Sequence, residues 1–222
     1  MGAAAHLGIK LEEYDAVIRT LIPHYEELVA TAGTAVGALT RPAPVVVDLG
    51  TGSGALAQSI ITARPKARLI GIDEDAGMLG LASRRLRGRI TAIEGNFERT
   101  AIPPCDVISA SFALHHIRTG RRKAALYKRC HAALRRGGML VSADCFLASA
   151  KSLQQDHRAA WLAHLQTNYS RAKAEGFLRA WAKEDVYFAL NREIEMLMKN
   201  PSEDKKKQSS AGDEPERRKR DH

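Results

Sequence analysis

Residues 45–54 decide the fold: Val45-Val46-Val47-Asp48-Leu49-Gly50-Thr51-Gly52-Ser53-Gly54. Residues 45–49 are a short apolar run, which predicts a strand buried on both faces. The glycines that follow stand at alternate positions, where they let the backbone turn tightly and approach a ligand without a Cβ in the way. A helix expected over residues 55–63 directs its free N–H groups at that ligand. The stretch therefore predicts a ligand-binding turn between a buried strand and a helix.

Strand and helix patterns alternate in the chain that follows. Further strands are predicted at residues 68–72, 90–93, 106–112 and 139–144, and further helices at 76–87 and 119–136. Gly137-Gly138 is expected to end the last of these helices and turn the chain into the fifth strand. Strands separated by helices pair in parallel through right-handed crossovers. We predict an α/β fold with a doubly wound, mainly parallel Rossmann-like sheet and helices on both faces.

The flanking segments differ from this core. From Leu11 to Leu28 apolar residues recur at helical spacing, and Pro23 divides the segment into two helices and stands in the first turn of the second. Beyond Leu147 the spacing is helical again. From residue 200 onward almost no residue is apolar, so this tail is expected to be disordered.

Composition excludes several classes of protein. The 222 residues suit one full domain, and 45% apolar with 27% charged residues exclude wholesale disorder. Lys and Arg number 34 against 25 Asp and Glu, and this net charge of +9 favours acidic partners such as nucleic acid. No apolar stretch approaches the ~20 residues that span a bilayer, and the first residues show no secretory signal, so we expect a cytoplasmic protein without membrane contact.

Two carboxylates bear on the identity of the ligand. Gly50, Gly52 and Ala55 satisfy the relaxed form of a dinucleotide fingerprint, which keeps an oxidoreductase as an alternative. Asp48 would repel a phosphate but tolerate an ammonium group, which favours a nucleoside that carries an amino acid. Asp73, at the end of the second strand, can accept hydrogen bonds from both ribose hydroxyls, with a helix N-cap as the alternative role.

Six stretches, in their order along the chain, resemble the class I S-adenosylmethionine-dependent methyltransferases. They are residues 47–54, 71–73, 95–97, 106–111, 114–117 and 134–138. The segment from Tyr14 to Tyr25 also resembles the helical lid of the small-molecule branch of that family. The resemblance implies S-adenosyl-L-methionine as cofactor and transfer of its methyl group to a small-molecule acceptor by in-line displacement.

The resemblance also implies roles for matching residues. The residues around the cofactor would be Tyr14 and Arg19 at its carboxylate, Asp48, Gly50, Gly52 and Gly54 at its methionine part, Asp73 at the ribose, Met78, Asn96 and Phe97 at the adenine, and Ser109 along its length. His115 would face the substrate and is the candidate catalytic residue. From the residues alone, Tyr14 also suits the core, Arg19 suits a solvated surface, and His115 suits a residue that orients the next helix.

On this basis the chain divides into a helical lid at 1–40, a cofactor-binding methyltransferase core at 41–147, a helical substrate or cap region at 148–199 and the charged tail at 200–222. We expect no metal site. His115 and His116 are adjacent, and adjacent residues rarely point at one ion, while no carboxylate follows at ligand spacing. A monomer or a homodimer is expected.

Two alternatives stay open beside the small-molecule enzyme. The net charge suits an RNA- or tRNA-modifying methyltransferase, but the fourth strand ends in Ser109-Ala110-Ser111-Phe112 and not in the Asn/Asp-Pro-Pro-aromatic signature of base-amine modifiers. The chain also passes into its charged tail without an apolar run for the strand pair that usually closes the family's sheet. That pattern suits a catalytically defective relative that still binds the cofactor.

Overall fold

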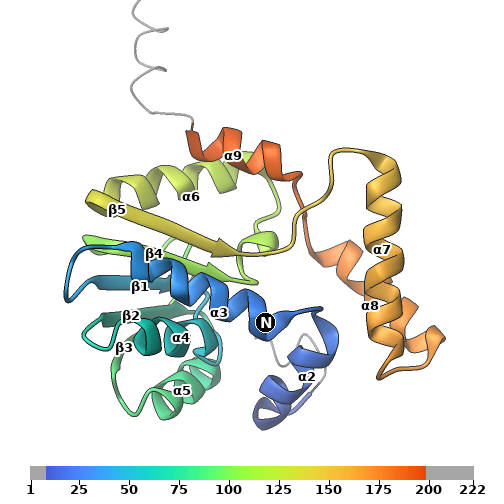
Figure 1. The fold of residues 1–222 in the computed structure, drawn as a ribbon, viewed down its shortest axis with the longest axis horizontal. Helices are drawn as coiled ribbons and strands as arrows, with labels where there is room; N and C mark the ends of the chain where they lie inside the picture. The colour runs from blue at the N-terminus through green and yellow to red at the C-terminus, as the bar shows by residue number, and fades with distance from the viewer. Residues whose placement is uncertain (1–8, 199–222) are drawn as a thin grey trace, which may run out of the picture.

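The computed structural model describes residues 9–198 (Figure 1). Its centre is a sheet of five strands: β1 (Val45–Leu49), β2 (Arg68–Asp73), β3 (Ile90–Glu94), β4 (Cys105–Ser111) and β5 (Leu134–Ala143). The strand order is β3-β2-β1-β4-β5, and every neighbouring pair is parallel. The predicted doubly wound, mainly parallel sheet is confirmed. The charged tail and the closing strand pair discussed above concern residues 199–222, which lie outside the described residues.

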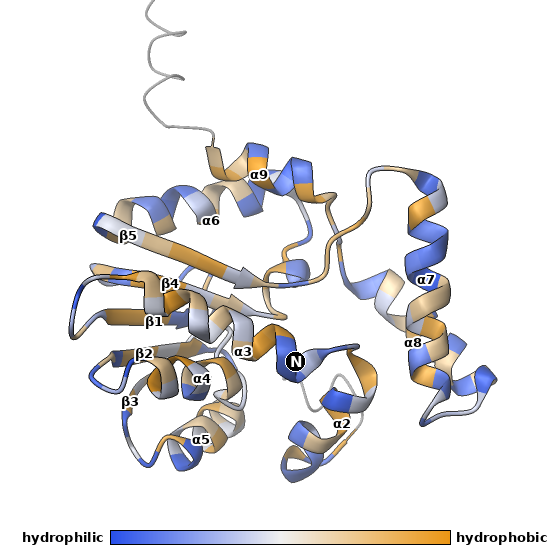
Figure 2. Ribbon diagram, viewed as in Figure 1, coloured by the Kyte–Doolittle hydropathy of each residue, from blue (hydrophilic) through white to orange (hydrophobic). Residues whose placement is uncertain are grey.

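Helices cover both faces of the sheet. Successive residues of a strand point to opposite faces, so Val46 and Val47 of β1 belong to different clusters of the core. Val46 packs with α3 (Tyr25–Ala35) and α4 (Ala55–Ala63), and Val47 packs with α6 (Gly120–Ala133) and α9 (Leu190–Met198). Helix α5 (Ala76–Arg85) follows β2 and contacts β2 and β3. Because both faces of β1 are covered, its side chains are apolar on both except for Asp48, which accepts a hydrogen bond from Ser109. Figure 2 shows β1 and β4 as largely hydrophobic.

The strand order creates a crevice above the carboxyl ends of β1 and β4. The chain leaves β1 toward β2 on one side and leaves β4 toward β5 on the other, and ligands bind at such a reversal in open α/β sheets. Helix α2 (Tyr14–Leu21), which follows a short 3-10 turn at Leu11–Glu13, lies beyond this edge together with α7 (Lys151–Gln166) and α8 (Arg171–Glu184) (Figure 1).

A small apolar cluster joins α2 to the α7–α8 pair. Leu21 of α2 packs against Leu165, Ala174 and Trp181, which are all buried. The indole Nε1 of Trp161 donates a hydrogen bond of 2.8 Å to the carbonyl of Leu21. Helix α2 and the α7–α8 pair therefore pack together over the crevice, although 140 residues separate the bonded pair.

Two predicted boundaries are wrong. Pro23 stands in the turn between α2 and α3 and not within the first turn of α3, because His24, with φ of 55°, occupies the N-cap position. Gly137-Gly138 does not end α6, since β5 begins at Leu134 directly after that helix. The glycines instead lie where the pairing with β4 is irregular: a Cβ on Gly138 would stand 2.8 Å from the carbonyl oxygen of Asp106.

Within residues 9–198, no helix has the length and the apolar character needed to cross a membrane.

Candidate functional site

A cavity of about 420 Å³ lies at the carboxyl ends of the strands. Its size falls in the range of small-molecule pockets. The loops after β1, β2, β3 and β4 form its floor, and α2, α7 and α8 contribute its outer wall. The residues that the sequence assigned to the site and that line this cavity are Tyr14, Gly50, Gly52, Asp73, Asn96, Phe97 and His115.

The glycines of the β1–α4 loop all have positive φ, but a side chain added at each would meet different surroundings. A Cβ on Gly50, whose φ is 65°, would lie 2.5 Å from the Cβ of Ala113. A Cβ on Gly54 would lie 3.0 Å from Ala82 of α5, so this glycine lets the loop pack on its neighbour. Gly52, with φ of 54°, has only the carbonyl of Gly50 at 4.0 Å beside that position, and it lines the cavity. A side chain at Gly52 would therefore occupy ligand space.

Asp73 joins the end of β2 to this loop. Its Oδ2 accepts a hydrogen bond of 2.8 Å from the backbone N–H of Gly52, and its Oδ1 accepts one of 2.9 Å from Asp75. Burial raises the pKa of Asp73, and these two hydrogen bonds lower it by a smaller amount. The N-cap of α5 is Asp75 and not Asp73. Each Asp73 oxygen keeps acceptor capacity for a hydroxyl group in the cavity.

Asp48 lies beneath the loop and does not line the cavity. It is 1% exposed, and its Oδ1 accepts a hydrogen bond of 2.6 Å from Ser109, its register partner on β4. Burial raises the pKa of Asp48 to about 7, against the hydrogen bond from Ser109 and with a contribution from the charge of Asp73. Ser109 is fully buried as well, so both residues support the loop from below.

Three further candidates stand in other surroundings. Met78 is fully buried within α5. The guanidinium of Arg19 pairs with Glu26 at 2.7 Å on the exposed surface. Asn96 lines the cavity, where its amide donates to Glu74 at 3.1 Å and its Oδ1 accepts from the backbone of Glu98 at 2.9 Å. The side-chain carbonyl oxygen of Asn96 thus already accepts a hydrogen bond that stabilises the turn after β3.

An ion pair fastens α2 over the loop. Asp15 of α2 accepts a hydrogen bond of 2.6 Å from Ser53 and forms an ion pair with Arg85 of α5. Arg85 also donates to Ser53 at 3.0 Å. This contact places Tyr14 and Ile18, on the same helix, in the cavity wall.

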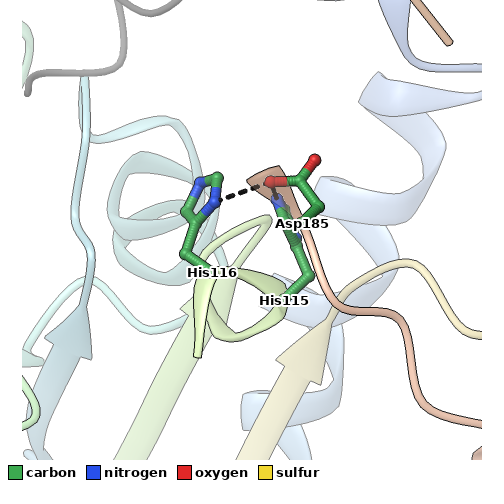
Figure 3. Close-up of side chains that lie close together, drawn as sticks. All are labelled: His115, His116 and Asp185. Atoms are coloured by element: carbon green, nitrogen blue, oxygen red, sulfur yellow. Dashed lines mark hydrogen bonds and ion pairs between the residues drawn. The ribbon is translucent and has the colours of Figure 1, made fainter. Parts of the chain in front are cut away.

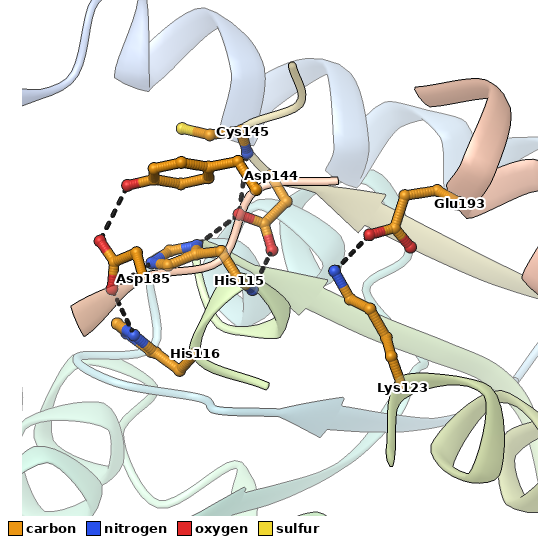
Figure 4. Close-up of polar contacts among 8 residues, drawn as sticks. His115, His116, Lys123, Asp144, Cys145, Asp185 and Glu193 are labelled. Carbon is orange, nitrogen blue, oxygen red and sulfur yellow. Dashed lines mark hydrogen bonds and ion pairs between the residues drawn. The ribbon is translucent and has the colours of Figure 1, made fainter. Parts of the chain in front are cut away.

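His115 stands at the other end of the cavity, in a 3-10 turn after β4 (Figure 4). Its Nδ1 donates a hydrogen bond of 2.5 Å to Asp144, and its backbone N–H donates one of 3.1 Å to the same carboxylate. Burial lowers the pKa of His115, but the charges of Asp144 and Asp185 and the hydrogen bond to Asp144 raise it above its ordinary value. The pKa of Asp144 is lowered, because the His115 charge and hydrogen bond outweigh its burial.

Asp185 brings a second carboxylate to this end. Its Oδ1 accepts a hydrogen bond of 3.0 Å from His116 and lies 3.9 Å from Nε2 of His115, and its Oδ2 accepts one of 2.8 Å from Tyr187. The side chain of Asp185 is only 5% exposed. Burial raises its pKa, but the hydrogen bonds and charges of His116, His115 and Tyr187 together lower it.

Aromatic rings complete the wall. Trp161 packs against Trp181 at 5.4 Å and against Tyr187 at 6.4 Å between ring centroids, and all three line the cavity. Cys145 lies beside them, and burial, with the charges of Asp144 and Asp185, raises the pKa of its thiol to about 12. This thiol stays protonated and is no nucleophile at neutral pH.

Sequence reasoning missed Asp144 and Asp185. A signal for Asp144 was present, because it ends the predicted fifth strand and carboxyl ends of neighbouring parallel strands meet at one edge of the sheet. Asp185 follows α8 and carries no local signal, since its position depends on how the α7–α8 pair packs.

The geometry agrees with comparisons to known proteins. A family model described as a methyltransferase domain matches residues 46–138. The uncharacterized methyltransferase GK2543 of Geobacillus kaustophilus is 29% identical over 147 residues, which are 65% of this chain and 64% of that protein. The uncharacterized methyltransferase YrrT of Bacillus subtilis is 30% identical over 145 residues, which are 64% of this chain and 67% of that protein.

The fold is shared with solved structures. The structure of SAM-bound CalS10, an amino pentose methyltransferase from Micromonospora echinaspora, has a TM-score of 0.52 and 24% identity and covers 60% of this chain and 56% of its own. This chain thus matches about two thirds or less of the length of each of these three proteins. With its sheet order, its glycine loop and these matches, the chain belongs to the class I S-adenosylmethionine-dependent methyltransferases.

Proposed function

We propose that this protein transfers a methyl group from S-adenosyl-L-methionine to a small-molecule acceptor. The observation that carries the proposal is a single cavity with two chemically different ends. Gly50, Gly52 and Asp73 line it at the ends of β1 and β2, and His115 and Asp185 line it near the ends of β4 and β5 on the other side of the strand order. A cofactor at the first end and an acceptor at the second would therefore meet in one cavity.

The residues at the first end fit the cofactor. The open side of Gly52 leaves room for the backbone to approach it, and the remaining lone pairs of Asp73 suit the ribose hydroxyls. Asn96 and Phe97, after β3, line the cavity and would meet the adenine, and Tyr14 of α2 would cover the cofactor. Asp48 lies buried beneath the loop, where an ammonium group of the cofactor would favour its charged form.

The other expected contacts would support the site from outside the cavity. In this proposal Ser109 holds Asp48, Gly54 lets the loop pack on α5, and Met78 fills the interior of that helix region. Arg19, paired with Glu26, contributes little to the cofactor carboxylate.

The chemistry needs alignment more than acid or base. When bound, S-adenosyl-L-methionine supplies an electrophilic methyl group on a leaving group that is already activated. Holding two reactants in line can remove ~7–11 kcal/mol from the barrier. The loop and Asp73 fix one reactant, while His115, held by Asp144, and the rings of Trp161 and Tyr187 orient the other and exclude water.

Several features favour a small acceptor over nucleic acid. The outer wall consists of aromatic rings, which suit an acceptor with a flat apolar part. Arg122, at the rim, pairs with Glu98 at 2.6 Å, and Arg118 donates to the carbonyls of Lys183 and Glu184. These cations are engaged within the chain. A cytoplasmic location, a monomeric or homodimeric state, and the division into lid, core and cap stay predictions of the sequence.

Turnover tests the proposal. Purified protein is incubated with S-adenosyl-L-methionine and a panel of phenols, amines and amino sugars, and S-adenosylhomocysteine and methylated product are followed by mass spectrometry. We expect product with at least one class of small acceptor, and loss of product in Asp73→Ala. Methylation of RNA alone, or cofactor binding without turnover across the panel, would instead support one of the two alternatives.

A further inference from the structure

Three side chains at the acceptor end converge on one point. His115, His116 and Asp185 each offer one donor atom, and the three atoms lie within 4.8 Å of one another (Figure 3). The sequence predicts no metal site here, because adjacent histidines rarely share an ion and no carboxylate follows at ligand spacing. In the structure the two imidazole rings lie with centroids 4.1 Å apart, and the carboxylate comes from residue 185, beyond α8.

The distances suit a first-row transition metal. Two ligands on a tetrahedral ion with bonds of about 2.0 Å lie about 3.3 Å apart. The Oδ1 of Asp185 is 3.0 Å from Nδ1 of His116 and 3.9 Å from Nε2 of His115, and these two distances bracket that value. Small side-chain rotations would bring all three atoms to bonding positions.

The hydrogen bonds behind these side chains are of the kind that orient metal ligands. A ligand histidine usually donates its other ring N–H to a carboxylate, which fixes the tautomer and directs the remaining nitrogen at the ion. His115 does this, because its Nδ1 donates to Asp144 and its Nε2 is left toward Asp185 (Figure 4). Asp185 is held in the same way, since its Oδ2 accepts from Tyr187.

The backbone also holds the ligands in place. The N–H of Val186 donates a hydrogen bond of 2.9 Å to the carbonyl of His115, and this bond joins the segment after α8 to the turn after β4. His115 is thus one partner of this bond, and Asp185 directly precedes the other partner. All three ligand side chains line the cavity, so a fourth coordination position would open toward the acceptor.

We propose that His115, His116 and Asp185 bind one divalent first-row transition cation, of the Zn²⁺, Co²⁺ or Fe²⁺ kind, at the acceptor end of the cavity. Two imidazoles and one carboxylate with an open position form the donor set of catalytic sites for these ions. Coordination through Nδ1 of His116 would replace its hydrogen bond to Asp185, with the imidazole proton carried on Nε2. The site deepens the proposed function and rests on it for its purpose: an acceptor oxygen at the open position would bind the ion and lose its proton more easily.

Metal titration tests the site without turnover. Untagged full-length protein, freed of metal by a chelator and then of the chelator, is titrated with Co²⁺ while the visible d–d absorption is recorded. Asp185→Asn and His116→Gln remove one ligand each, and His131→Gln, an exposed histidine of α6 outside the cavity, is the matched control. Thermal unfolding is used to check that each variant is folded. His116 is half-exposed, so its variant stays informative if Asp185→Asn is unstable.

We expect one Co²⁺ per chain, a four-coordinate d–d spectrum, and affinity at least about tenfold weaker in the two ligand variants but unchanged in His131→Gln. The inference is overturned if the wild type binds no Co²⁺, or binds it no more tightly than the folded ligand variants do. Calorimetry of the same samples with S-adenosylhomocysteine separates the two proposals. Protein that binds S-adenosylhomocysteine but not Co²⁺ would overturn only the proposed metal site. Protein that binds Co²⁺ but not S-adenosylhomocysteine would overturn only the proposed methyltransferase function.

Discussion

The carboxylate of Asp73 accepts a hydrogen bond of 2.8 Å from the backbone N–H of Gly52. These residues belong to two separate signals in the sequence, the strand-end acid and the glycine loop. In the structure one bond unites them, so the group expected to hold the ribose also fixes the loop that closes on the cofactor.

We therefore expect Asp73→Ala to weaken the binding of S-adenosylhomocysteine by at least about tenfold, because hydrogen bonds to a charged group contribute about 1.5–3 kcal/mol each. Isothermal titration calorimetry measures the change. Glu94→Ala is the control, since Glu94 is the register partner of Asp73 on β3 but is exposed and outside the cavity. Equal affinities for the two variants would place the ribose elsewhere.

Gly52→Ala should impair ligand binding more than folding. The φ of 54° costs any L-residue about 1–2 kcal/mol, and the new Cβ would enter the cavity. Gly88→Ala is a matched control, because Gly88 has φ of 72°, has no atom within 4 Å of the added Cβ, and does not line the cavity. We expect both variants to lower the Tm by similar amounts, and only Gly52→Ala to lose binding of S-adenosylhomocysteine. A Gly52 variant that binds normally would remove the close-approach argument.

The buried Asp48 should make stability depend on pH. Its pKa rises from an ordinary 3.8 to about 7 in the folded protein, mainly through burial. The folded state then binds this proton more tightly than the unfolded state, so the group lowers the free energy of unfolding as pH rises from about 4 to about 7. Asp48→Asn keeps an acceptor for Ser109 and removes the charge.

Urea unfolding between pH 4.5 and 8 gives the free energy of unfolding of Asp48→Asn and of the wild type, and the difference between them isolates the contribution of Asp48. The variant should become more stable relative to the wild type as pH rises across that range, and the difference should level off near pH 8. A difference that does not change with pH would show that Asp48 titrates normally. Ser109→Ala removes a hydrogen bond that lowers the Asp48 pKa, so in that variant the decline of stability should move to higher pH.

The ion pair between Asp15 and Arg85 should hold α2 over the cavity. Asp15→Ala removes this pair and the hydrogen bond from Ser53. We expect faster hydrogen exchange in α2 and weaker binding of S-adenosylhomocysteine, by several-fold. Glu26→Ala, which breaks only the exposed pair with Arg19, should change neither quantity, because exposed ion pairs contribute little. If both variants behave alike, α2 does not act as a lid.

The sequence predicted the backbone arrangement around the glycine loop because its signals are local. The residues from Val45 to Asp73 form one strand–helix–strand unit, whose geometry follows from buried strands and a glycine turn. The register of β1 with β2 then places Asp48 opposite Gly71, and the end of β2 brings Asp73 to the loop. Helix periodicity alone could not decide whether Met78 is buried in the core or contacts the cofactor, or whether Arg19 pairs with Glu26 or reaches the cofactor. In each case both positions are compatible with the same helical face.

The cluster around His115 was less predictable because it depends on long-range packing. His116 and Asp185 are 69 residues apart, and their contact requires the α7–α8 pair to lie against α2 and the sheet edge. Gly137-Gly138 follows the same principle. A glycine pair after a helical pattern usually marks a helix end, but here pairing with β4 decides its structure.

The loop at Gly50–Gly54 and Asp73 are proposed to bind S-adenosyl-L-methionine, and calorimetric titration of the wild-type protein with S-adenosylhomocysteine is the decisive measurement. We expect saturable binding of one molecule per chain, with NAD⁺ producing no heat under the same conditions. Well-folded protein that shows no heat with S-adenosylhomocysteine, and above all one that binds NAD⁺ instead, would contradict it.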